Sequence, residues 1–309
     1  MVSRKDYPGR NFINLHELNK EDLNEIVNFG LEVKADASRS KDLMQNKSFI
    51  LLFDKPSTRT RISFEVAISQ LGAHCTFLDT KTSQLGRGES IKDTAKVMSR
   101  YVNGVIIRNA NHDELIEFSD NSDIPVINAL TDLSHPCQIM ADLMTLKEQF
   151  GTIQDLNIAW IGDGNNVANT WIQASAIFNF KLNMAIPKRL MPYKEYVEIA
   201  KKNNANLTIT QDIDSVIKSA NCIVTDTWVS MNDLETERLE KIKILKDYQV
   251  NMELLQKSSG DAIFLHCLPA HRGEEVTNEV IDSSRSLVYD QAENRLHIQK
   301  AILKYCLNI

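Results

Sequence analysis

The chain has 309 residues, of which 43% are hydrophobic and 25% are charged, with a formal net charge of −6. This composition is that of a globular protein, and the length allows two domains of ordinary size. The acidic balance argues against nucleic acid as a partner, although a local cluster of arginines could still attract an anionic substrate. No apolar run reaches the roughly 18 residues of a membrane helix, so we expect no membrane partner.

The N-terminal residues and the cysteines both predict a cytoplasmic protein. Residues 1–6 lack the apolar core of a signal peptide. The cysteines lack the paired spacing of a disulfide framework or a zinc site, which favours a reducing compartment and no bound metal. They are Cys75, Cys137, Cys222, Cys267 and Cys306.

Short apolar runs alternate with helical patterns along most of the chain. This alternation is typical of α/β folds with parallel sheets. The runs that predict strands are residues 49–53, 75–78, 105–107, 126–129, 158–162, 184–186, 207–210, 222–225, 263–266 and 287–289.

A cluster of hydrogen-bond donors follows the first predicted strand. Ser57, Thr58, Arg59 and Thr60 stand at the start of a helical pattern that Gly72 closes. A helix N-terminus presents unpaired N–H groups, and arginine adds a planar fork, so this turn predicts a phosphate or carboxylate site. The alternative is a polar first turn with solvated arginines.

Two more polar positions follow in the first half. The loop QLGRGES at residues 84–90 carries two glycines and could bring Gln84 and Arg87 to a ligand, or it could be an ordinary surface loop. Arg108 ends the apolar run 105–107. In open α/β sheets, the carboxyl edge of a parallel strand faces the crevice where ligands bind.

A helix is predicted from Pro136, after Ser134 and His135, to a stop at Gly151. His135 and Gln138 share one face of its first turn. Both suit a carbonyl oxygen or an amide better than a metal, although a capping histidine is the alternative. Because a fresh strand–helix series follows, we expect a domain boundary within this helix.

The second half carries two candidate loops. WIGDGNN at residues 160–166 resembles a dinucleotide fingerprint, but Val167 replaces its third glycine, so the evidence for dinucleotide binding is weak. The amides of Asn165 and Asn166 suit a substrate carboxylate instead. Asp226, in DTWVSM, follows an apolar run and could hold an ammonium group, or it could be a helix cap.

Cys267 follows an apolar strand within FLHCLPAHRGEEV, residues 264–276. It is either a small buried residue or a reactive thiol. His266 precedes it and points to the opposite strand face, which argues against a catalytic pair of the two. Arg295, in AENR, is expected to start the last helix at about residue 291 and adds another donor.

These motifs, in this order, resemble the aspartate/ornithine carbamoyltransferase family over nearly the whole chain. The run Ser57–Thr60 resembles its carbamoyl phosphate motif. HPCQ at residues 135–138 and HCLP at 266–269 match its ornithine branch, and DTWVSM resembles its ornithine loop. The family usually has glycine where Asn232 stands here, which bears on loop closure and amine specificity.

The resemblance implies an α/β fold of two domains, each a parallel sheet flanked by helices, with the active site in the interdomain cleft. Residues 1–145 would bind carbamoyl phosphate, residues 146–290 would bind L-ornithine, and the helix at 291–309 would pack back on the first domain. It implies a homotrimer in which Gln84 reaches a neighbour's active site, and no cofactor. The reaction would give L-citrulline and phosphate, as in arginine biosynthesis.

The resemblance also implies residue roles. Cys267, Arg108 and His135 would be catalytic. The carbamoyl phosphate site would consist of Ser57, Thr58, Arg59, Thr60, Gln84, Arg108, His135, Gln138, Cys267, Leu268 and Arg295. The ornithine site would consist of Asn166, Asp226, Ser230 and Met231.

Four other functions remain open at this stage. A relative could act on putrescine or an acylated ornithine. The sibling aspartate enzyme would need basic residues where DTWVSM supplies an acid. A nicotinamide dehydrogenase shares the α/β alternation but needs the intact glycine fingerprint. A non-catalytic anion-binding protein would need neither Cys267 nor Asp226.

Overall fold

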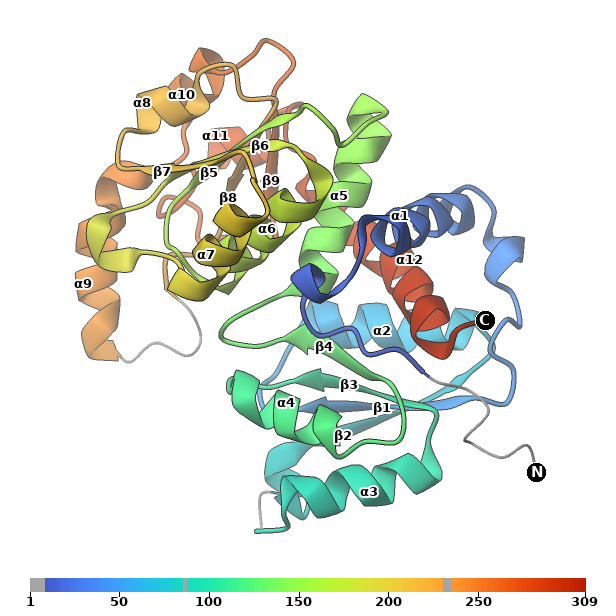
Figure 1. The fold of residues 1–309 in the computed structure, drawn as a ribbon. Coiled ribbons are helices and arrows are strands. Elements are labelled where there is room, and N and C mark those ends of the chain that lie inside the picture. The colour runs from blue at the N-terminus through green and yellow to red at the C-terminus, as the bar shows by residue number, and fades with distance from the viewer. Residues whose placement is uncertain (1–8, 86–87, 230–234) are drawn as a thin grey trace. The chain divides into compact units, whose positions relative to one another are not determined.

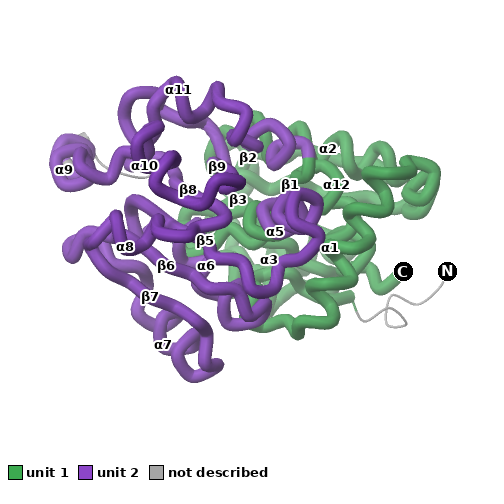
Figure 2. Tube along the Cα trace, turned by 90° about the horizontal axis from the view of Figure 1, so that it is seen from above, with its two compact units in different colours: residues 1–140, 294–309 green, residues 141–293 purple. Residues whose placement is uncertain are grey.

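The structure is a computed structural model that describes residues 9–85, 88–229 and 235–309. The chain forms two compact units, residues 1–140 with 294–309 and residues 141–293 (Figure 2). None of the helices among the described residues is long and apolar enough to cross a membrane.

The first unit is built on a four-stranded sheet in the order β2-β1-β3-β4, and every neighbouring pair is parallel. Side chains alternate between its faces, so Ile50, Leu52, Val105 and Ile107 pack into one core cluster with α3 and α4. Figure 1 shows these two helices together on one side of the sheet. The strands are β1 (Ser48–Phe53), β2 (His74–Asp79), β3 (Gly104–Arg108) and β4 (Val126–Leu130).

The helices of the first unit include two, α5 and α12, that continue across the boundary between the units. The helices are α1 (Lys20–Ala35), α2 (Thr58–Gln70), α3 (Ile91–Tyr101), α4 (His112–Asp120), α5 (Pro136–Phe150) and α12 (Val288–Leu307), with 3-10 turns η2 (Leu15–Glu17), η3 (Ala37–Ser40) and η4 (Thr80–Thr82).

The second unit is built on a five-stranded parallel sheet in the order β7-β6-β5-β8-β9. Helices cover both faces, and α6 packs beside α7 (Figure 1). Its strands are β5 (Asn157–Ile161), β6 (Lys181–Ala185), β7 (Leu207–Thr210), β8 (Cys222–Thr225) and β9 (Ile263–His266). Its helices are α6 (Asn166–Phe178), α7 (Lys194–Lys202), α8 (Ile213–Ile217), α9 (Glu235–Leu245), α10 (Met252–Lys257) and α11 (Asn278–Ile281), with 3-10 turns η6 (Lys188–Leu190) and η7 (Lys246–Tyr248).

Each sheet has one topological switch point, where successive connections leave toward opposite edges. In the first sheet it lies between β1 and β3, and in the second it lies between β5 and β8. Ligands of open α/β sheets bind outside the carboxyl ends of the strands at such points. The loops after these four strands are therefore the positions where the fold favours binding residues.

The predicted parallel α/β class is confirmed, but the last predicted strand, residues 287–289, is wrong. Ser286 makes only an isolated bridge with Phe264, and α12 begins at Val288. Val288 is buried and Tyr289 is 64% exposed, so the run is the first turn of a two-sided helix. A short apolar run cannot distinguish strand from helix by periodicity alone. Arg295 consequently lies inside α12 and does not start it.

The helix predicted from Pro136 is confirmed as α5. It ends at Phe150, and Gly151 adopts the left-handed φ of 73° that a C′ glycine commonly takes. The compact units divide within this helix, between residues 140 and 141. The assignment of residues 1–145 and 146–290 to two substrates stays a prediction.

Candidate active site

The first group of predicted site residues lies at the carboxyl edge of β1 and β3. Ser57 is at the N-cap position of α2, without a side-chain capping bond, and Thr60 is buried in the first turn, while Thr58 and Arg59 are exposed. Arg108 is the buried last residue of β3. Helix N-terminal N–H groups and an arginine therefore meet at the switch point of the first sheet.

Asp54 ties these two loops together. Its main-chain N–H donates to the Arg108 carbonyl at 3.0 Å, and its carboxylate accepts the N–H of Ala110 at 2.9 Å. The main chain and the side chain of Asp54 thus fix the loop after β1 against the loop after β3, and both contacts use main-chain groups of the β3 loop.

Arg295, on α12, links a residue of α5 to a residue of α2. Its Nη1 donates to Gln138 Oε1 at 2.6 Å, and its Nη2 donates to Thr60 Oγ1 at 3.1 Å, and all three side chains are buried. Because the Gln138 oxygen accepts from Arg295, its amide presents the NH₂ group as a donor. The Thr60 hydroxyl likewise accepts from Arg295, so its own proton is available to another acceptor.

His135 is kept neutral in this cluster. Burial lowers its pKa well below the ordinary value, and the positive charges of Arg295 and Arg108 lower it further. A neutral imidazole supplies one N–H donor and adds no third positive charge. The arrangement of donors suits an oxygen-rich anion with an adjoining carbonyl group.

Arg61 does not join the cluster. Its guanidinium lies 3.7 Å from the centroid of the Phe77 ring, and its Nε donates to Glu65 at 2.9 Å. Of the two arginines in the STRTR stretch, this one is engaged on the surface of α2 and β2.

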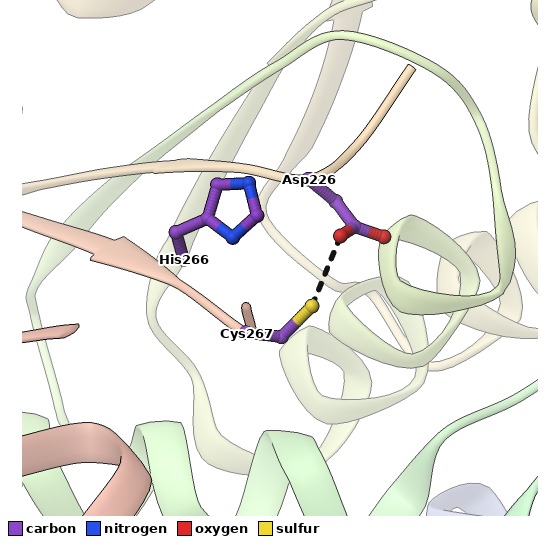
Figure 3. A group of neighbouring side chains, drawn as sticks. All are labelled: Asp226, His266 and Cys267. Atoms are coloured by element: carbon purple, nitrogen blue, oxygen red, sulfur yellow. Dashed lines mark hydrogen bonds between the residues drawn. The ribbon is translucent and has the colours of Figure 1, made fainter. Parts of the chain in front are cut away.

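The second group of predicted residues lies at the carboxyl edge of β5, β8 and β9. The buried Asp226 carboxylate accepts from Asn165 Nδ2 at 2.7 Å and from the Cys267 thiol at 2.9 Å. Figure 3 shows the thiol pointing at the carboxylate. Asn165 is also the N-cap of α6, where its Oδ1 accepts from Val167 and Ala168. The Asn165 amide is therefore held at both ends, because its oxygen caps α6 and its nitrogen donates to Asp226.

His266 does not depend on Cys267 for its hydrogen bonds. Its Nδ1 accepts from the Leu268 N–H at 2.9 Å, and its Nε2 lies 3.2 Å from the buried Glu275 carboxylate. Since Nδ1 accepts, Nε2 carries the proton and donates to Glu275. Leu268 adopts a left-handed φ of 57°, which bulky residues seldom adopt. The imidazole thus helps to hold the backbone beside Cys267.

Asp226, His266 and Cys267 also form a set of ligand types that transition metals bind. Ligand atoms of Asp226, His266 and Cys267 lie within 4.8 Å of one another (Figure 3). However, both imidazole nitrogens of His266 have protein partners, and the thiol donates its proton to Asp226. A metal would have to replace these bonds, so the geometry fits a hydrogen-bonding site better.

The other cysteines are poor nucleophiles. Burial raises the pKa of Cys75 and of Cys137 to about 12. It also raises the pKa of Cys222 and of Cys306 well above the ordinary value. These thiols stay protonated, which argues against a nucleophilic role for any of the four.

The glycine loop after β5 has a structural explanation. A Cβ on Gly164 would lie 2.3 Å from the Leu190 carbonyl oxygen and 2.4 Å from the Pro192 nitrogen. The space that a dinucleotide pyrophosphate would need beside this glycine is filled by backbone. Asn166, the first residue of α6, is half-buried and lies at the same carboxyl edge of the second sheet as Asp226.

Several predicted residues are not placed with either group. Gln84 is exposed, and Ser230 and Met231 lie outside the described residues. Sequence reasoning proposed the Asn165 amide for a substrate carboxylate, but its nitrogen donates to Asp226 and its oxygen caps α6. Sequence reasoning left Glu275 out of the site, although its carboxylate lies beside His266. The contact of Glu275 with His266 has no local signal.

Comparison with known proteins places both groups in one family. Residues 10–148 match the family described as "Aspartate/ornithine carbamoyltransferase, carbamoyl-P binding domain". Residues 154–306 match "Aspartate/ornithine carbamoyltransferase, Asp/Orn binding domain". The two matches together cover most of the chain.

Curated relatives and solved structures agree with this match. An ornithine carbamoyltransferase of Rhodopseudomonas palustris is 48% identical over 301 residues, with 96% of each chain covered. The structure of ornithine carbamoyltransferase from Pyrococcus furiosus matches with a TM-score of 0.92 at 40% identity, covering 97% of each chain. That of the anabolic ornithine carbamoyltransferase from Campylobacter jejuni matches with a TM-score of 0.92 at 38% identity, covering 97% of this chain and 99% of that one.

Proposed function

We propose that this chain, which belongs to the aspartate/ornithine carbamoyltransferase family, transfers the carbamoyl group of carbamoyl phosphate to the δ-amine of L-ornithine. The products are L-citrulline and phosphate. The chain matches both domains of the family, and the curated relatives are named ornithine carbamoyltransferase. The observation that carries the ornithine assignment is the buried Asp226, held between Asn165 and Cys267. An acid there suits an amino group, whereas aspartate would bring a second carboxylate.

The first half of the site would bind carbamoyl phosphate. The N-terminus of α2 would hold the phosphate, and the neutral His135 and the buried Arg108 would polarise the carbamoyl carbonyl. Arg295 would fix Gln138 and Thr60 as donors through the bonds described above. The phosphate contacts would come from Ser57, Thr58, Arg59 and Thr60.

The second half would bind ornithine. Asn166 would contact the α-carboxylate side, and Asp226 would lie near an amino group of the substrate. Ser230 and Met231 would complete this binding. Cys267 and the Leu268 carbonyl would lie where the amine meets the carbamoyl group, with Cys267 orienting or deprotonating the amine.

The chemistry requires a neutral amine. A free alkyl amine has a pKa of about 10, so the site must favour the unprotonated form. The amine nitrogen then attacks the carbonyl carbon, a C–N bond forms, and a tetrahedral oxyanion results. Its collapse breaks the bond to the phosphate oxygen, and the departing phosphate takes up the proton that the nitrogen loses. Orientation and donors from Thr60, Arg108 and His135 would supply most of the rate enhancement.

The proposed cellular role is arginine biosynthesis in the cytoplasm, by a homotrimer in which Gln84 completes a neighbour's site. A structural neighbour at 38% identity is named anabolic, which supports the biosynthetic direction. Sedimentation measurements would test the trimer, and a Gln84→Ala chain mixed with an inactive partner variant would test sharing of the site.

A related amine, such as putrescine or acetylornithine, is the second candidate substrate. The observation that favours it is Asn232, which stands where the family usually has glycine in the ornithine loop. Asparagine has less backbone freedom than glycine, although it tolerates left-handed backbone better than most residues, so the substitution bears on loop closure and on amine specificity.

The deciding experiment measures carbamoylated product from carbamoyl phosphate with ornithine, putrescine, acetylornithine or aspartate as the acceptor. We expect strong turnover with ornithine alone. Turnover with another amine would retain the carbamoyl phosphate half of the proposal and overturn the ornithine half. No turnover with any acceptor, despite binding of carbamoyl phosphate, would indicate a non-catalytic anion-binding protein.

A further inference from the structure

We infer that a buried polar network of Asn14, His112, Asn128, Thr131 and Ser134 positions His135 for carbamoyl phosphate. The network lies wholly within the first unit, and the peptide bond from Ser134 to His135 joins it to the proposed substrate contacts. The inference rests on the proposed function, because it assigns a task to His135.

Ser134 is held through all of its polar groups. Its N–H donates to Thr131 Oγ1 at 3.2 Å, and its carbonyl accepts from the Thr131 N–H at 2.9 Å. Its hydroxyl donates to Asn14 Oδ1 at 3.0 Å and accepts from Asn128 Nδ2 at 2.9 Å. The Ser134 side chain is fully buried. Because the peptide planes before and after Ser134 are each held by a hydrogen bond, the backbone leading into His135 has little freedom.

The network draws on three elements that are distant in the sequence. Asn128 lies on β4, and His112 is the first residue of α4. Asn14 comes from the N-terminal segment, where Phe12 pairs with Ile127 in a parallel bridge. The segment that leads into α5 is therefore fixed to the sheet, to a helix and to the N-terminal segment together.

The contacts of the His112 ring indicate which of its two nitrogens carries the proton. Asn14 Nδ2 donates to Glu17 at 2.9 Å, and it lies 3.4 Å from His112 Nε2. Since an amide nitrogen can only donate, His112 Nε2 must accept. The proton of a neutral ring then sits on Nδ1, which lies 2.8 Å from Thr131 Oγ1. Thr131 accepts it, so the chain of bonds is complete only with neutral, Nδ1-protonated His112.

The environment of His112 agrees with this assignment. The ring is buried, and burial lowers its pKa below the ordinary value. A protonated ring would direct a second N–H at the Asn14 amide, which has no acceptor to offer there. The network is thus matched to one protonation state and one tautomer of the ring.

The test compares Ser134→Ala with Ser99→Ala. Ser99 is a matched control because it is a buried serine of the same unit whose hydroxyl donates to Ala95 O at 2.7 Å and accepts from Asp123 N at 3.0 Å. We expect Ser134→Ala to lower kcat/KM for carbamoyl phosphate by about 10-fold or more, as small misplacements of reacting groups do. KM for ornithine should change less than about twofold, and Ser99→Ala should match the wild type.

A second pair of variants separates the hydroxyl from the shape of the side chain. Thr131→Val removes the hydroxyl at nearly constant volume and should lower kcat/KM for carbamoyl phosphate, whereas Thr131→Ser keeps it and should restore most of the value. If Ser134→Ala fails to fold, the comparison of Thr131→Val with Thr131→Ser tests whether the network positions His135.

Histidine ring spectra of the ¹⁵N-labelled protein give a readout that loss of stability would not move. We expect the Nδ1-protonated tautomer at His112, and a change in the His135 ring signals in Ser134→Ala but not in Ser99→Ala. Unchanged His135 signals in Ser134→Ala, or equal kcat/KM in the two serine variants, would overturn the inference. The proposed function would still stand in that case, provided that the wild type is active. An inactive wild type would overturn both.

Discussion

Arg295 shows how one side chain can prepare several others for binding. Its guanidinium donates to Gln138 and Thr60 from two different nitrogens, so it fixes which atoms of these residues remain as donors. Lysine carries the same charge but concentrates its donors on one nitrogen. The two contacts therefore depend on the planar guanidinium with its separate donor nitrogens more than on the positive charge.

Arg295→Lys should therefore lower kcat/KM for carbamoyl phosphate by about 10- to 100-fold, the range expected for a lost charge-assisted hydrogen bond. Steady-state kinetics with varied carbamoyl phosphate at saturating ornithine would measure it. Arg285→Lys is the matched control, since Arg285 also donates from two nitrogens, to the main-chain carbonyls of Leu255 at 2.6 Å, of Ser259 at 3.1 Å and of Gly260. It should cost stability and leave kcat/KM unchanged. Equal kinetic effects of the two substitutions would contradict the proposed use of the fork.

At the scale of elements, the end of α5 depends on backbone conformation. Gly151 adopts a φ of 73°, and nothing lies within 4 Å of the position that a Cβ would take. Any cost of adding a side chain there must come from the left-handed backbone, because no neighbour is in the way.

Gly151→Ala should lower the free energy of unfolding by about 1–2 kcal/mol, the cost of a left-handed alanine. Gly260→Ala is the control, since its Cβ would also meet open space and its backbone does not lie in the left-handed region. Its effect should stay within about 0.5 kcal/mol. Urea unfolding of the two variants measures the difference. A Gly151→Ala chain as stable as Gly260→Ala would show that the helix end relaxes without strain.

The switch points explain why two sheets of different size carry the site residues in the same way. Thr60 follows β1 and Arg108 ends β3 at the first switch point, and Asn165 and Asp226 follow β5 and β8 at the second. Only at such a point do two neighbouring loops diverge and leave room at the sheet edge. Polar side chains there can face a ligand while their strands remain buried.

At the scale of the whole molecule, two buried histidines couple stability to pH. Burial lowers the pKa of His135 and of His112 in the folded chain, while the unfolded chain titrates near 6.5. Arg295 and Arg108 lower the His135 pKa further, whereas Asp132 and Glu17 partly oppose the shift at His112. Below pH 6.5 the unfolded state therefore binds protons that the folded state does not.

The free energy of unfolding should fall as the pH drops from about 6.5 toward the folded-state pKa values, by at most about 1.4 kcal/mol per pH unit for each histidine. Urea unfolding at pH 7.5, 6.5 and 5.5 would measure the slope. His112→Gln should reduce it, and substitution of the exposed His74 by glutamine should not. A stability that is flat over this range, or a slope that His112→Gln leaves intact, would contradict the prediction.

The sequence by itself determined the local features of this protein. Alternating apolar runs and helical spacing predicted the parallel α/β class, and Pro136 with Gly151 marked both ends of α5. Polar residues directly after buried runs identified Thr60, Arg108 and Asp226 as site candidates. These signals are readable because periodicity, capping and strand ends depend on neighbours within a few residues.

Only the tertiary structure decided which distant residues meet. Arg295 reaches Thr60 across 235 residues, and Asn165 reaches Asp226 across 61. It also decided that Val288 and Tyr289 open α12 and form no strand, because a short apolar run fits either element. Strand order and burial are set by packing between segments far apart in the chain, and local spacing carries no record of that packing.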